Sequence, residues 1–445
     1  MPPITNPVAA DDFTAEASPA VARSNRVADI MMSTTFQLIC ALLIGVPLPD
    51  ILRKTYENLP DSVMSYDNSM IGTVAAVLFG YLIYRKVTSL PGTNALLNQL
   101  PGFIVSYLAV AALFFALRLD FSRQQFVISF LLVSGFFWVL TFVAVRVRRT
   151  TFGFVSVGKA ETLTKLDYVN WIRFNSPQDA DKVPHIPLVA DFNAGLSPDW
   201  ERYIAEAAIS GRRVFNAKQL KESLEGQVEI ENLSENSFGH LAPDSIYAPI
   251  KLYIDILQAI AILALVWPIM LIVALAIKID SKGPAIFSQK RMGFRGIPFT
   301  VYKFRSMNVA EQGSKDLPPG VLDITRAGDQ RITRVGHFIR KTRLDELPQL
   351  FNVLKGEMSW IGPRPETLNL SEWYETEIPF YRYRHIVRPG ISGWAQIKQG
   401  HVTSVDDVRE KLEYDFYYVR NFSIWLDILI VIQTVRVILT GHGSK

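Results

Sequence analysis

The feature that most constrains this chain is an apolar run of 22 residues, Ile256–Ile277, in which the one polar side chain is Gln258. A helix of that length extends for about 33 Å, enough to cross the hydrocarbon core of a bilayer. Pro268 lies inside the run and removes a backbone hydrogen-bond donor, so we expect the helix to bend there. Two topologies stay open: a straight span with the flanking segments on opposite sides, and a re-entrant hairpin with both on one side.

The N-terminal third contains four further apolar stretches, at Ser33–Pro49, Met70–Tyr84, Gly102–Leu117 and Phe126–Val147. The middle two are short for a bilayer, which usually requires about 20 residues. If the N-terminus is cytoplasmic, seven Lys and Arg flank the inner ends of these stretches and four flank the outer ends. This bias favours that orientation. We predict a cytoplasmic tail at 1–30 and a four-helix transmembrane domain at 31–150. If one short stretch is only an interfacial or core helix, the orientation of everything after it is reversed.

Residues 151–243 have the composition of a soluble domain. Phe152–Val157 and Ile186–Val189 are apolar and short enough for buried strands, and Trp200–Ala208 fits a helix. The first strand is followed by Gly158, but the three-glycine turn that lets a backbone approach a pyrophosphate is missing. We therefore predict a small, degenerate Rossmann-like α/β domain that packs or dimerises and does not bind a dinucleotide.

A strongly basic segment follows the long apolar run. Between Phe287 and Arg343, twelve Lys and Arg stand against four acids. Such an excess predicts an anionic ligand or anionic lipid headgroups, and both apply if the substrate is itself anchored in the membrane. Nucleic acid is not an expected partner, because the segment contains no recognition helix and no aromatic stacking module.

Two adjacent acids, Asp345 and Glu346, come directly after this basic segment. Neighbouring residues of a helix point about 100° apart, so the two carboxylates are expected to have different roles. A carboxylate near arginines can attack phosphorus, while its neighbour can bind Mg²⁺ that neutralises a diphosphate. On spacing alone, however, an exposed acid pair before Pro348 is the better explanation.

Six motifs in order reverse that balance: Gln289–Gly293, Tyr302–Met307, Arg343–Leu350, Gly362–Pro365, Arg388–Gln396 and Asp415–Tyr418. Over residues 244–439 they resemble the bacterial sugar transferase family, the polyprenyl-phosphate hexose-1-phosphate transferases. The N-terminal half is similar to that of the larger members, which carry four membrane helices and a Rossmann-like domain before the catalytic part.

The resemblance implies a role for each motif residue. Asp345 is expected to be the nucleophile that captures the sugar phosphate, with Glu346 beside it as the Mg²⁺ ligand. The expected substrate-binding residues are Lys303, Arg305, Arg340, Arg343, Arg364, Arg388 and Asp415. The planar fork of Arg matches phosphate oxygens in pairs. Asp415 could equally form a plain salt bridge.

The predicted fold is that of a membrane protein of the α plus α/β class. Its mostly helical catalytic domain, at 244–445, is carried on a re-entrant membrane helix at 254–279 that breaks at Pro268. The resemblance decides the topology, since nucleotide sugars are cytoplasmic. The catalytic domain is therefore expected on the cytoplasmic face of the bacterial inner membrane, in contact with its lipid. The C-terminal run Ile424–Leu439 contains Asp427 and other polar residues, so we expect an amphipathic helix lying on the bilayer and not a second span.

The predicted reaction moves a hexose 1-phosphate from a UDP-sugar, preferably UDP-glucose or UDP-galactose, to undecaprenyl phosphate. It releases UMP and starts an exopolysaccharide or O-antigen repeat unit. A homodimer is one assembly compatible with the sequence. Two other functions are considered: an inactive membrane scaffold, which would tolerate loss of Asp345, and a phosphate hydrolase that uses the same aspartate with water.

Overall fold

The computed structural model describes residues 8–9, 31, 33–56, 63–88, 95–147, 151–166, 169–230, 246–308, 331–399 and 404–440. The chain divides into two compact units, Met1–Gly226 and Gln227–Lys445. The predicted boundaries near residues 150 and 243, and most of the predicted tail at 1–30, lie outside the described residues.

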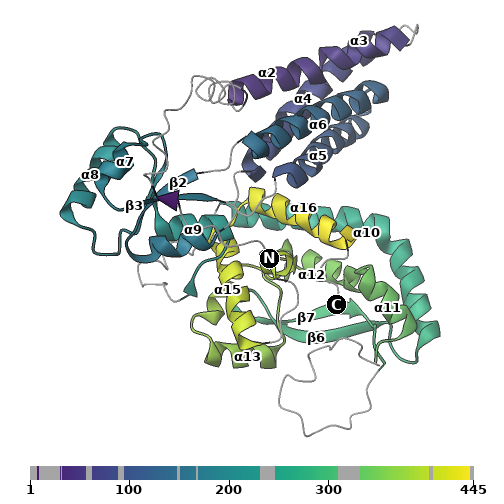
Figure 1. The fold of residues 1–445 in the computed structure, drawn as a ribbon. Helices are drawn as coiled ribbons and strands as arrows, with labels where there is room; N and C mark the ends of the chain where they lie inside the picture. The colour runs from purple at the N-terminus through teal and green to yellow at the C-terminus, as the bar shows by residue number, and fades with distance from the viewer. Residues whose placement is uncertain are drawn as a thin grey trace. The chain divides into compact units, whose positions relative to one another are not determined.

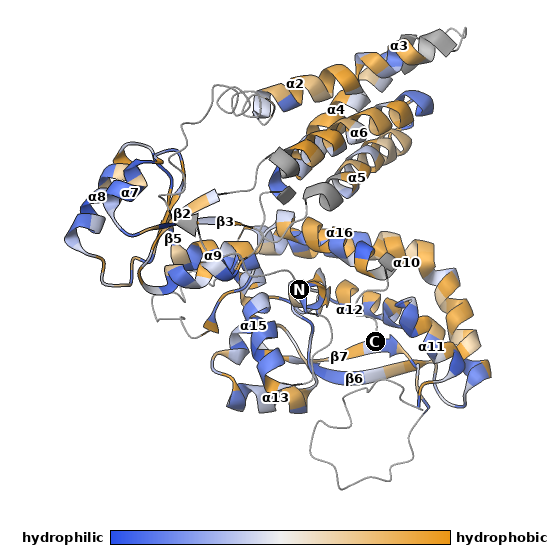
Figure 2. Cartoon of the chain, in the orientation of Figure 1, coloured by the Kyte–Doolittle hydropathy of each residue, from blue (hydrophilic) through white to orange (hydrophobic). Residues whose placement is uncertain are grey.

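The first unit begins with apolar helices, drawn in Figure 1 and coloured by hydropathy in Figure 2. They are α2 (Thr34–Gly45), α3 (Pro47–Tyr56), α4 (Val63–Thr88), α5 (Ala95–Ala116) and α6 (Arg123–Val147). In the described part of the chain, three helices are long and apolar enough to cross a membrane: Thr34–Leu52, Arg123–Val143 and Tyr247–Asp280. The two short apolar stretches, Met70–Tyr84 and Gly102–Leu117, lie in α4 and α5. The described parts of these two helices are not among the three that are long and apolar enough to cross a membrane.

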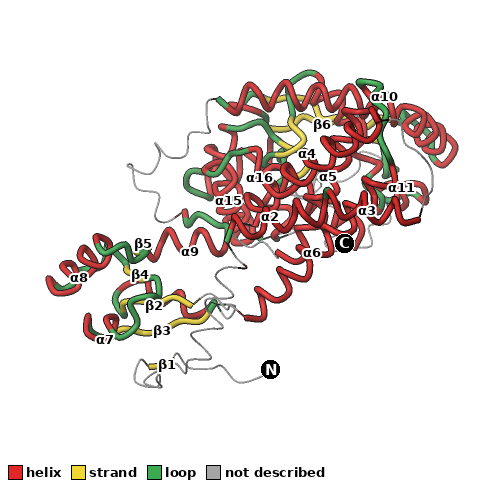
Figure 3. The backbone as a smooth tube through the Cα atoms, turned by 90° about the horizontal axis from the view of Figure 1, so that it is seen from above, coloured by secondary structure: helices red, strands yellow, loops and turns green. Residues whose placement is uncertain are grey.

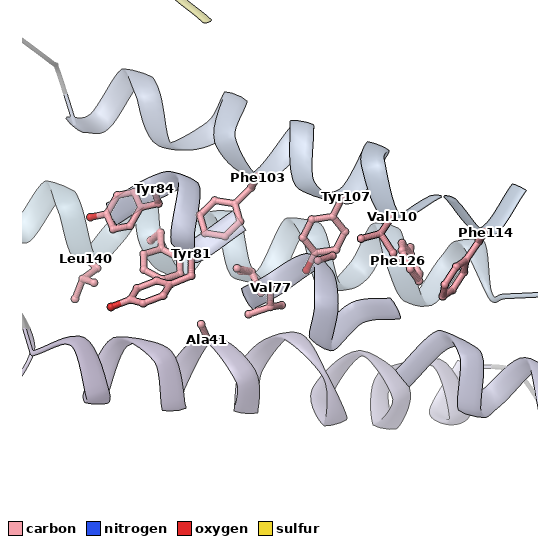
Figure 4. Packing of buried hydrophobic residues seen from close by; sticks show 13 residues of the cluster. Ala41, Val77, Tyr81, Tyr84, Phe103, Tyr107, Val110, Phe114, Phe126 and Leu140 are labelled. Carbon is pink, nitrogen blue, oxygen red and sulfur yellow. The ribbon is translucent and has the colours of Figure 1, made fainter. Parts of the chain in front are cut away.

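The interior of this helical part is filled by aromatic rings (Figure 4). The rings of Phe103 and Phe137 stack with their centroids 5.0 Å apart. Helices approach closely at Gly80, where an added Cβ would lie 2.5 Å from the ring of Phe103. The buried hydroxyl groups of Tyr107 and Ser129 lie 2.7 Å apart and hydrogen-bond to each other. Such pairing is what an apolar environment requires of polar groups.

The rest of the first unit is built on a parallel sheet, as the sequence predicts (Figure 3). Its spatial order is β1-β3-β2-β4-β5. The strands are β1 (Val8–Ala9), β2 (Thr151–Val155), β3 (Asn170–Phe174), β4 (Leu188–Ala190) and β5 (Val214–Asn216). The accompanying helices are η2 (Gly158–Lys165), α7 (Pro177–Asp181), α8 (Pro198–Ile209) and α9 (Ala217–Glu225). Phe152 and Phe154 belong to the hydrophobic cluster on one face, and Val155 and Phe174 belong to the cluster on the other.

The edge of this sheet that binds pyrophosphate in dinucleotide-binding folds holds a carboxylate instead. Gly158 turns the chain after β2 with a φ of +66°. Behind it, Asp191 accepts hydrogen bonds from the backbone N–H of Lys159 at 2.8 Å and of Asn193 at 3.0 Å. A side chain therefore occupies the backbone donors at this turn, which agrees with the missing glycine pattern.

The second unit contains the six motifs. It consists of α10 (Tyr247–Asp280), β6 (Ile286–Met292), η5 (Phe294–Gly296), β7 (Pro298–Phe304), α11 (Arg334–Lys341), η7 (Leu344–Gln349), α12 (Leu350–Leu354), β8 (Ser359–Ile361), α13 (Leu368–Glu377), η8 (Tyr381–Ile386), β9 (Gly390–Ser392), α14 (Trp394–Lys398), α15 (Val405–Arg420) and α16 (Ile424–Thr440). Strands β6 and β7 form an antiparallel hairpin, and β8 and β9 form a parallel pair. The unit is mostly helical, as predicted.

Helix α10 carries the long apolar run and packs on this unit along both halves. It is one helix of 34 residues with Pro268 inside it, and it bends along its length (Figure 1). In its first half Ala259 belongs to a cluster with Val353, and in its second half Ile277 belongs to a cluster with Phe304. Because the helix continues through the proline, the expected break is a bend within one helix.

Helix α16 differs from the expected surface helix in one respect. Asp427 is buried and accepts hydrogen bonds from Tyr247 at 2.7 Å and Lys251 at 2.6 Å, both on α10, and from Tyr418 at 2.8 Å. Its carboxylate therefore fastens α16 to the start of α10 and does not belong to a polar face at the bilayer. The sequence interpretation of this residue is corrected accordingly.

Candidate active site

The two adjacent acids lie in η7, directly after a sharp turn in the chain. Helix α11 ends at Lys341 with Thr342 as its C-cap, and Arg343 follows in the left-handed conformation with a φ of 59°. Non-glycine residues seldom adopt this conformation, so the surrounding structure must hold it. The turn redirects the chain and brings Asp345 and Glu346 towards the side chains of β7 and of the loop after β8.

Glu346 is surrounded by positive charge. Its Oε1 lies 2.8 Å from Nη2 of Arg364 and 3.3 Å from Nζ of Lys303. A third cation, Nη1 of Arg343, lies 3.7 Å away. Burial alone would raise the pKa of Glu346, but these cations together hold it well below its usual range. Glu346 is therefore ionised at neutral pH.

Asp345 has the opposite environment. Burial, and next the negative charge of Glu346, raise its pKa, while Lys303, Arg364 and Arg340 act against that rise. Its Oδ1 is buried and has no hydrogen-bond partner among the described residues. An acceptor oxygen left without a partner inside a protein is costly and calls for a ligand. The two neighbours thus have pKa values that are pushed apart, which is typical of carboxylates with separate roles in one site.

Lys303 lies next to the last residue of β7, and its Nζ is 3.3 Å from Oε1 of Glu346. Burial, and next the charge of Arg364, lower the pKa of Lys303 to about 8. The amine is therefore charged at neutral pH but loses its proton at mildly alkaline pH.

Arg364 is placed by a close contact between two backbones. An added Cβ at Gly362 would lie 2.3 Å from the carbonyl oxygen of Arg388, and one at Gly390 would lie 2.1 Å from the nitrogen of Gly362. Only glycine fits where two main chains approach so closely. The glycines of two motifs therefore join β8 to β9 and fix the loop that carries Arg364.

Comparison with known proteins decides the family. The model of the family described as bacterial sugar transferase matches residues 246–441. A UDP-N-acetylgalactosamine-undecaprenyl-phosphate N-acetylgalactosaminephosphotransferase of Aeromonas hydrophila is 43% identical over 375 residues, which cover 84% of this chain and 86% of that protein. The chain belongs to the bacterial sugar transferase family.

Two other relatives match less than half of the transferase. A UDP-glucose:undecaprenyl-phosphate glucose-1-phosphate transferase of Klebsiella pneumoniae is 47% identical over 183 residues, which are 41% of this chain and 38% of that protein. The exopolysaccharide production protein PSS of Rhizobium leguminosarum bv. phaseoli is 41% identical over 202 residues, which are 44% of this chain and 98% of that protein. A relative can therefore be matched over nearly its whole length by less than half of this chain.

The structure gathers six of the nine predicted catalytic and substrate-binding residues of the transferase in one cluster. Arg340 joins this cluster through its electrostatic effect on Asp345. The members are Asp345, Glu346, Lys303, Arg340, Arg343 and Arg364.

The other three predicted residues have partners elsewhere. Arg305 is buried, and its guanidinium donates to the backbone oxygens of Ser281 at 2.8 Å and Lys282 at 2.9 Å, at the end of α10. Arg388 donates to the backbone oxygen of Gly356 at 3.0 Å. Asp415 is 1% exposed and pairs with the buried guanidinium of Arg384 at 2.7 Å. Of the two roles that the sequence left open for Asp415, the salt bridge is the one seen.

The sequence analysis did not identify three charged residues that contact the loop carrying Arg364 or belong to it. They are Arg384, Glu366 and Lys411, of which Lys411 forms an ion pair with Glu366. The available signals were that Glu366 directly follows one motif and that Lys411 lies four residues before Asp415. A four-residue spacing places two side chains on one helix face but does not identify their partners.

The carboxylates of the cluster fit the Mg²⁺ that the resemblance implies. Within the described residues there is no group of three or more His, Cys, Asp or Glu that could hold a metal. Mg²⁺, however, is commonly held by one or two carboxylates together with substrate phosphates. Glu346, the ligand that the resemblance implies, would supply the protein's carboxylate to such a site, which leaves the buried oxygen of Asp345 to the substrate.

Proposed function

We propose that this transferase moves a sugar 1-phosphate from a UDP-sugar to undecaprenyl phosphate through a covalent intermediate on Asp345. The observation that carries the proposal is the contrast between the two neighbours: Glu346 is neutralised by cations, while a buried oxygen of Asp345 has no partner in the part of the chain that the structure describes. That oxygen has the features of a nucleophile held ready for an electrophilic phosphorus.

In the first step, the free oxygen of ionised Asp345 attacks the phosphorus next to the sugar. A bond forms between this oxygen and phosphorus, and the bond from phosphorus to the bridging oxygen of the diphosphate breaks. The electron pair leaves with UMP. Lys303 and Arg364 can stabilise the charge on the phosphate oxygens as the bond breaks. Bound Mg²⁺ would neutralise the charge of the diphosphate.

In the second step, a phosphate oxygen of undecaprenyl phosphate attacks the same phosphorus. The bond between phosphorus and Asp345 breaks, and the carboxylate is restored. The product is a sugar joined to undecaprenol through a diphosphate. Because UMP leaves before the lipid reacts, the kinetics are expected to be ping-pong.

The proposal places the second unit on the cytoplasmic face of the inner membrane, with α10 as a re-entrant helix. Supporting this, the same unit holds both ends of α10. Near its start, Lys251 pairs with Asp427 at 2.6 Å, and at its end Arg305 binds the backbone of Ser281 at 2.8 Å. A helix crossing the bilayer would separate these ends by about 30 Å of hydrocarbon. We further propose that the four N-terminal apolar stretches, which form α2 to α6, anchor the chain in the same membrane.

The donor proposed is a UDP-linked hexose or N-acetylhexosamine. UDP-glucose and UDP-galactose are the donors preferred from the resemblance to the large family members. The relative that matches along 84% of this chain is named for UDP-N-acetylgalactosamine, and several that match the catalytic part are named for UDP-glucose. Lipid-linked sugars of this kind begin exopolysaccharide or O-antigen repeat units, which is the pathway proposed here.

The test uses purified full-length protein with undecaprenyl phosphate, Mg²⁺ and each of these UDP-sugars. Release of UMP and formation of lipid-linked sugar are expected with at least one donor. Donor labelled in the sugar phosphate should label the protein in the absence of lipid, and Asp345→Asn should abolish both labelling and turnover. If none of the donors leads to release of UMP, the proposal is overturned. Release of free sugar phosphate in the absence of lipid would favour a hydrolase.

A further inference from the structure

The loop that carries Arg364 is held at every residue from Gly362 to Glu366. Four contacts use the two small sheets: the nitrogen of Gly362 donates to the oxygen of Ser392 at 2.9 Å, and the oxygens of Pro363, Pro365 and Glu366 accept from Gly390, the Arg291 guanidinium and the Met292 nitrogen. The fifth contact is different in kind. The backbone oxygen of Arg364 accepts a hydrogen bond at 2.9 Å from a buried side chain, the guanidinium of Arg384.

The guanidinium of Arg384 is fixed on its other sides as well. Its Nε and Nη2 lie 3.0 Å and 2.7 Å from Oδ2 of Asp415. Its Nη1 donates to the hydroxyl of Tyr381 at 2.7 Å. Arg384 is 2% exposed and Asp415 is 1% exposed. Two bonds to one carboxylate fix the plane of a guanidinium, and inside a protein neither partner of such a pair can be removed without leaving an unpaired charge.

A second buried pair supports the same loop. Lys411, one helical turn before Asp415 on α15, forms an ion pair with the carboxylate of Glu366. Burial would raise the pKa of Glu366, but Lys411, Arg384 and Arg291 lower it to about 2. Both ends of the segment Arg364–Glu366 are thus tied to α15 by charged groups.

We infer that Arg384, oriented by Asp415, is a positioning residue that aims Arg364 at Glu346. The inference deepens the proposed function and rests on it. Asp415 then acts through Arg384 and touches neither substrate nor metal. In the described part of the chain, its carboxylate hydrogen-bonds to Arg384 alone. A carboxylate that is buried and already engaged in this way is not available to a diphosphate.

A double-mutant cycle tests this inference, since a residue that acts through Arg364 should matter only while Arg364 is present. Arg384→Lys keeps the charge but cannot make the planar set of bonds. We expect it to lower kcat/KM by about tenfold or more in the wild type, because small misplacements of a catalytic group are costly. In an Arg364→Ala background the further loss should be less than about twofold. An equal loss in both backgrounds would overturn the inference.

The matched control is Arg305→Lys. Arg305 is also buried and also donates to backbone oxygens, but at the end of α10. Whatever this change costs in the wild type, it should cost the same in the Arg364→Ala background. The control therefore separates action through Arg364 from a general effect of altering a buried arginine.

Asp415→Asn addresses the alternative that Asp415 binds metal. A metal ligand, when removed, raises the Mg²⁺ concentration needed for half-maximal activity. We expect that concentration to be unchanged in Asp415→Asn, while kcat/KM falls and again falls little further in the Arg364→Ala background. A shift of about tenfold or more in the Mg²⁺ requirement, the size typical for groups that support a metal, would assign Asp415 to the metal instead.

Hydrogen exchange provides a readout that does not depend on turnover. Pro363 and Pro365 have no amide hydrogen, so the probes are the backbone amides of Gly362, Arg364, Glu366 and Thr367. They should exchange faster in Arg384→Lys than in the wild type, and should be unchanged in Arg305→Lys. Unaltered exchange in Arg384→Lys would contradict the positioning role. If the wild type releases no UMP with any donor, the proposed function fails, and the exchange experiment still decides whether Arg384 holds this loop.

Discussion

At the scale of single residues, the chemistry depends on how one cluster divides its charges. Glu346 takes up the positive charge of Arg364, Lys303 and Arg343, so the adjacent Asp345 is not locked into an ion pair. An aspartate fully paired with arginine would be a poor nucleophile, because its electron pairs would already be engaged. In the proposed mechanism, the second carboxylate therefore keeps the first available as a nucleophile, in addition to any role toward a metal.

Lys303 gives the reaction an alkaline limit. Its pKa is lowered to about 8, so its charge is present below that pH and is lost above it. We expect kcat/KM to fall as the pH rises through about 8. Lys303→Arg should lower activity at neutral pH but move this decline to higher pH, because arginine stays protonated. A pH profile of UMP release checks this, and an unchanged alkaline limb in Lys303→Arg would show that another group titrates.

Arg305 and Arg364 should behave differently although both are expected from the motifs to bind phosphate. Arg305→Met removes charge-assisted hydrogen bonds at the end of α10 and should destabilise the protein by about 2 kcal/mol or more. Arg364→Met should instead lower kcat/KM by about tenfold or more, as expected for loss of a phosphate contact. Thermal unfolding and steady-state kinetics of both variants provide the comparison. A lower thermal midpoint for Arg364→Met alone would reverse the assignment.

At the scale of elements, the close contact between β8 and β9 fixes the loop that carries Arg364. Gly390→Ala would place a Cβ 2.1 Å from the nitrogen of Gly362, so the two strands must separate. We expect a loss of about 1–3 kcal/mol in stability and a loss of activity through displaced Arg364. Gly195→Ala is the matched control, because nothing lies within 4 Å of its added Cβ. An unaffected Gly390→Ala protein would show that the strands can part without cost.

The topology of α10 can be tested with cysteine reporters at its two ends. The native Cys40 is first replaced by serine, and Ile246→Cys and Lys282→Cys are then made separately at exposed positions. A re-entrant helix predicts that neither reacts with a membrane-impermeant maleimide in spheroplasts and that both react in opened cells. Arg118→Cys, in the loop between α5 and α6, should react in spheroplasts. Labelling of one end of α10 from outside would establish a straight span.

At the scale of the whole molecule, the second unit is expected to act alone. It begins at Gln227, and the backbone N–H of Val228 already donates to Glu413 of α15 at 3.1 Å. One relative is matched over 98% of its length by only 202 residues, so a family member can be about as short as this unit. A chain starting just before Gln227 should therefore retain UMP release in membranes, and the same chain with Asp345→Asn should not. A folded but inactive fragment would assign the first unit a catalytic role.

The sequence predicted the helices and strands better than it predicted which side chains contact one another. Apolar runs identified the apolar helices and strand β2, because burial produces a pattern of apolar residues in the local sequence. Asp427 was misread, since its partner Lys251 lies 176 residues away and no local pattern connects them. Arg305 shares a motif with Lys303, but β7 ends at Phe304, and the chain then turns toward α10. One motif thus serves two places, a division that residue spacing does not reveal.

The ion pairs around Glu346 have a consequence for turnover. Before donor binds, Lys303 and Arg364 are already satisfied by this carboxylate. A diphosphate that binds here must replace the carboxylate of Glu346 as the partner of Lys303 and Arg364. Its binding therefore exchanges one anionic partner for another and does not neutralise unpaired cations. In the proposed reaction, that competition lowers the affinity for the donor, and the carboxylate of Glu346 displaces the UMP that leaves. The cluster thereby favours release over retention, as suits a catalyst that must clear its site for a second substrate.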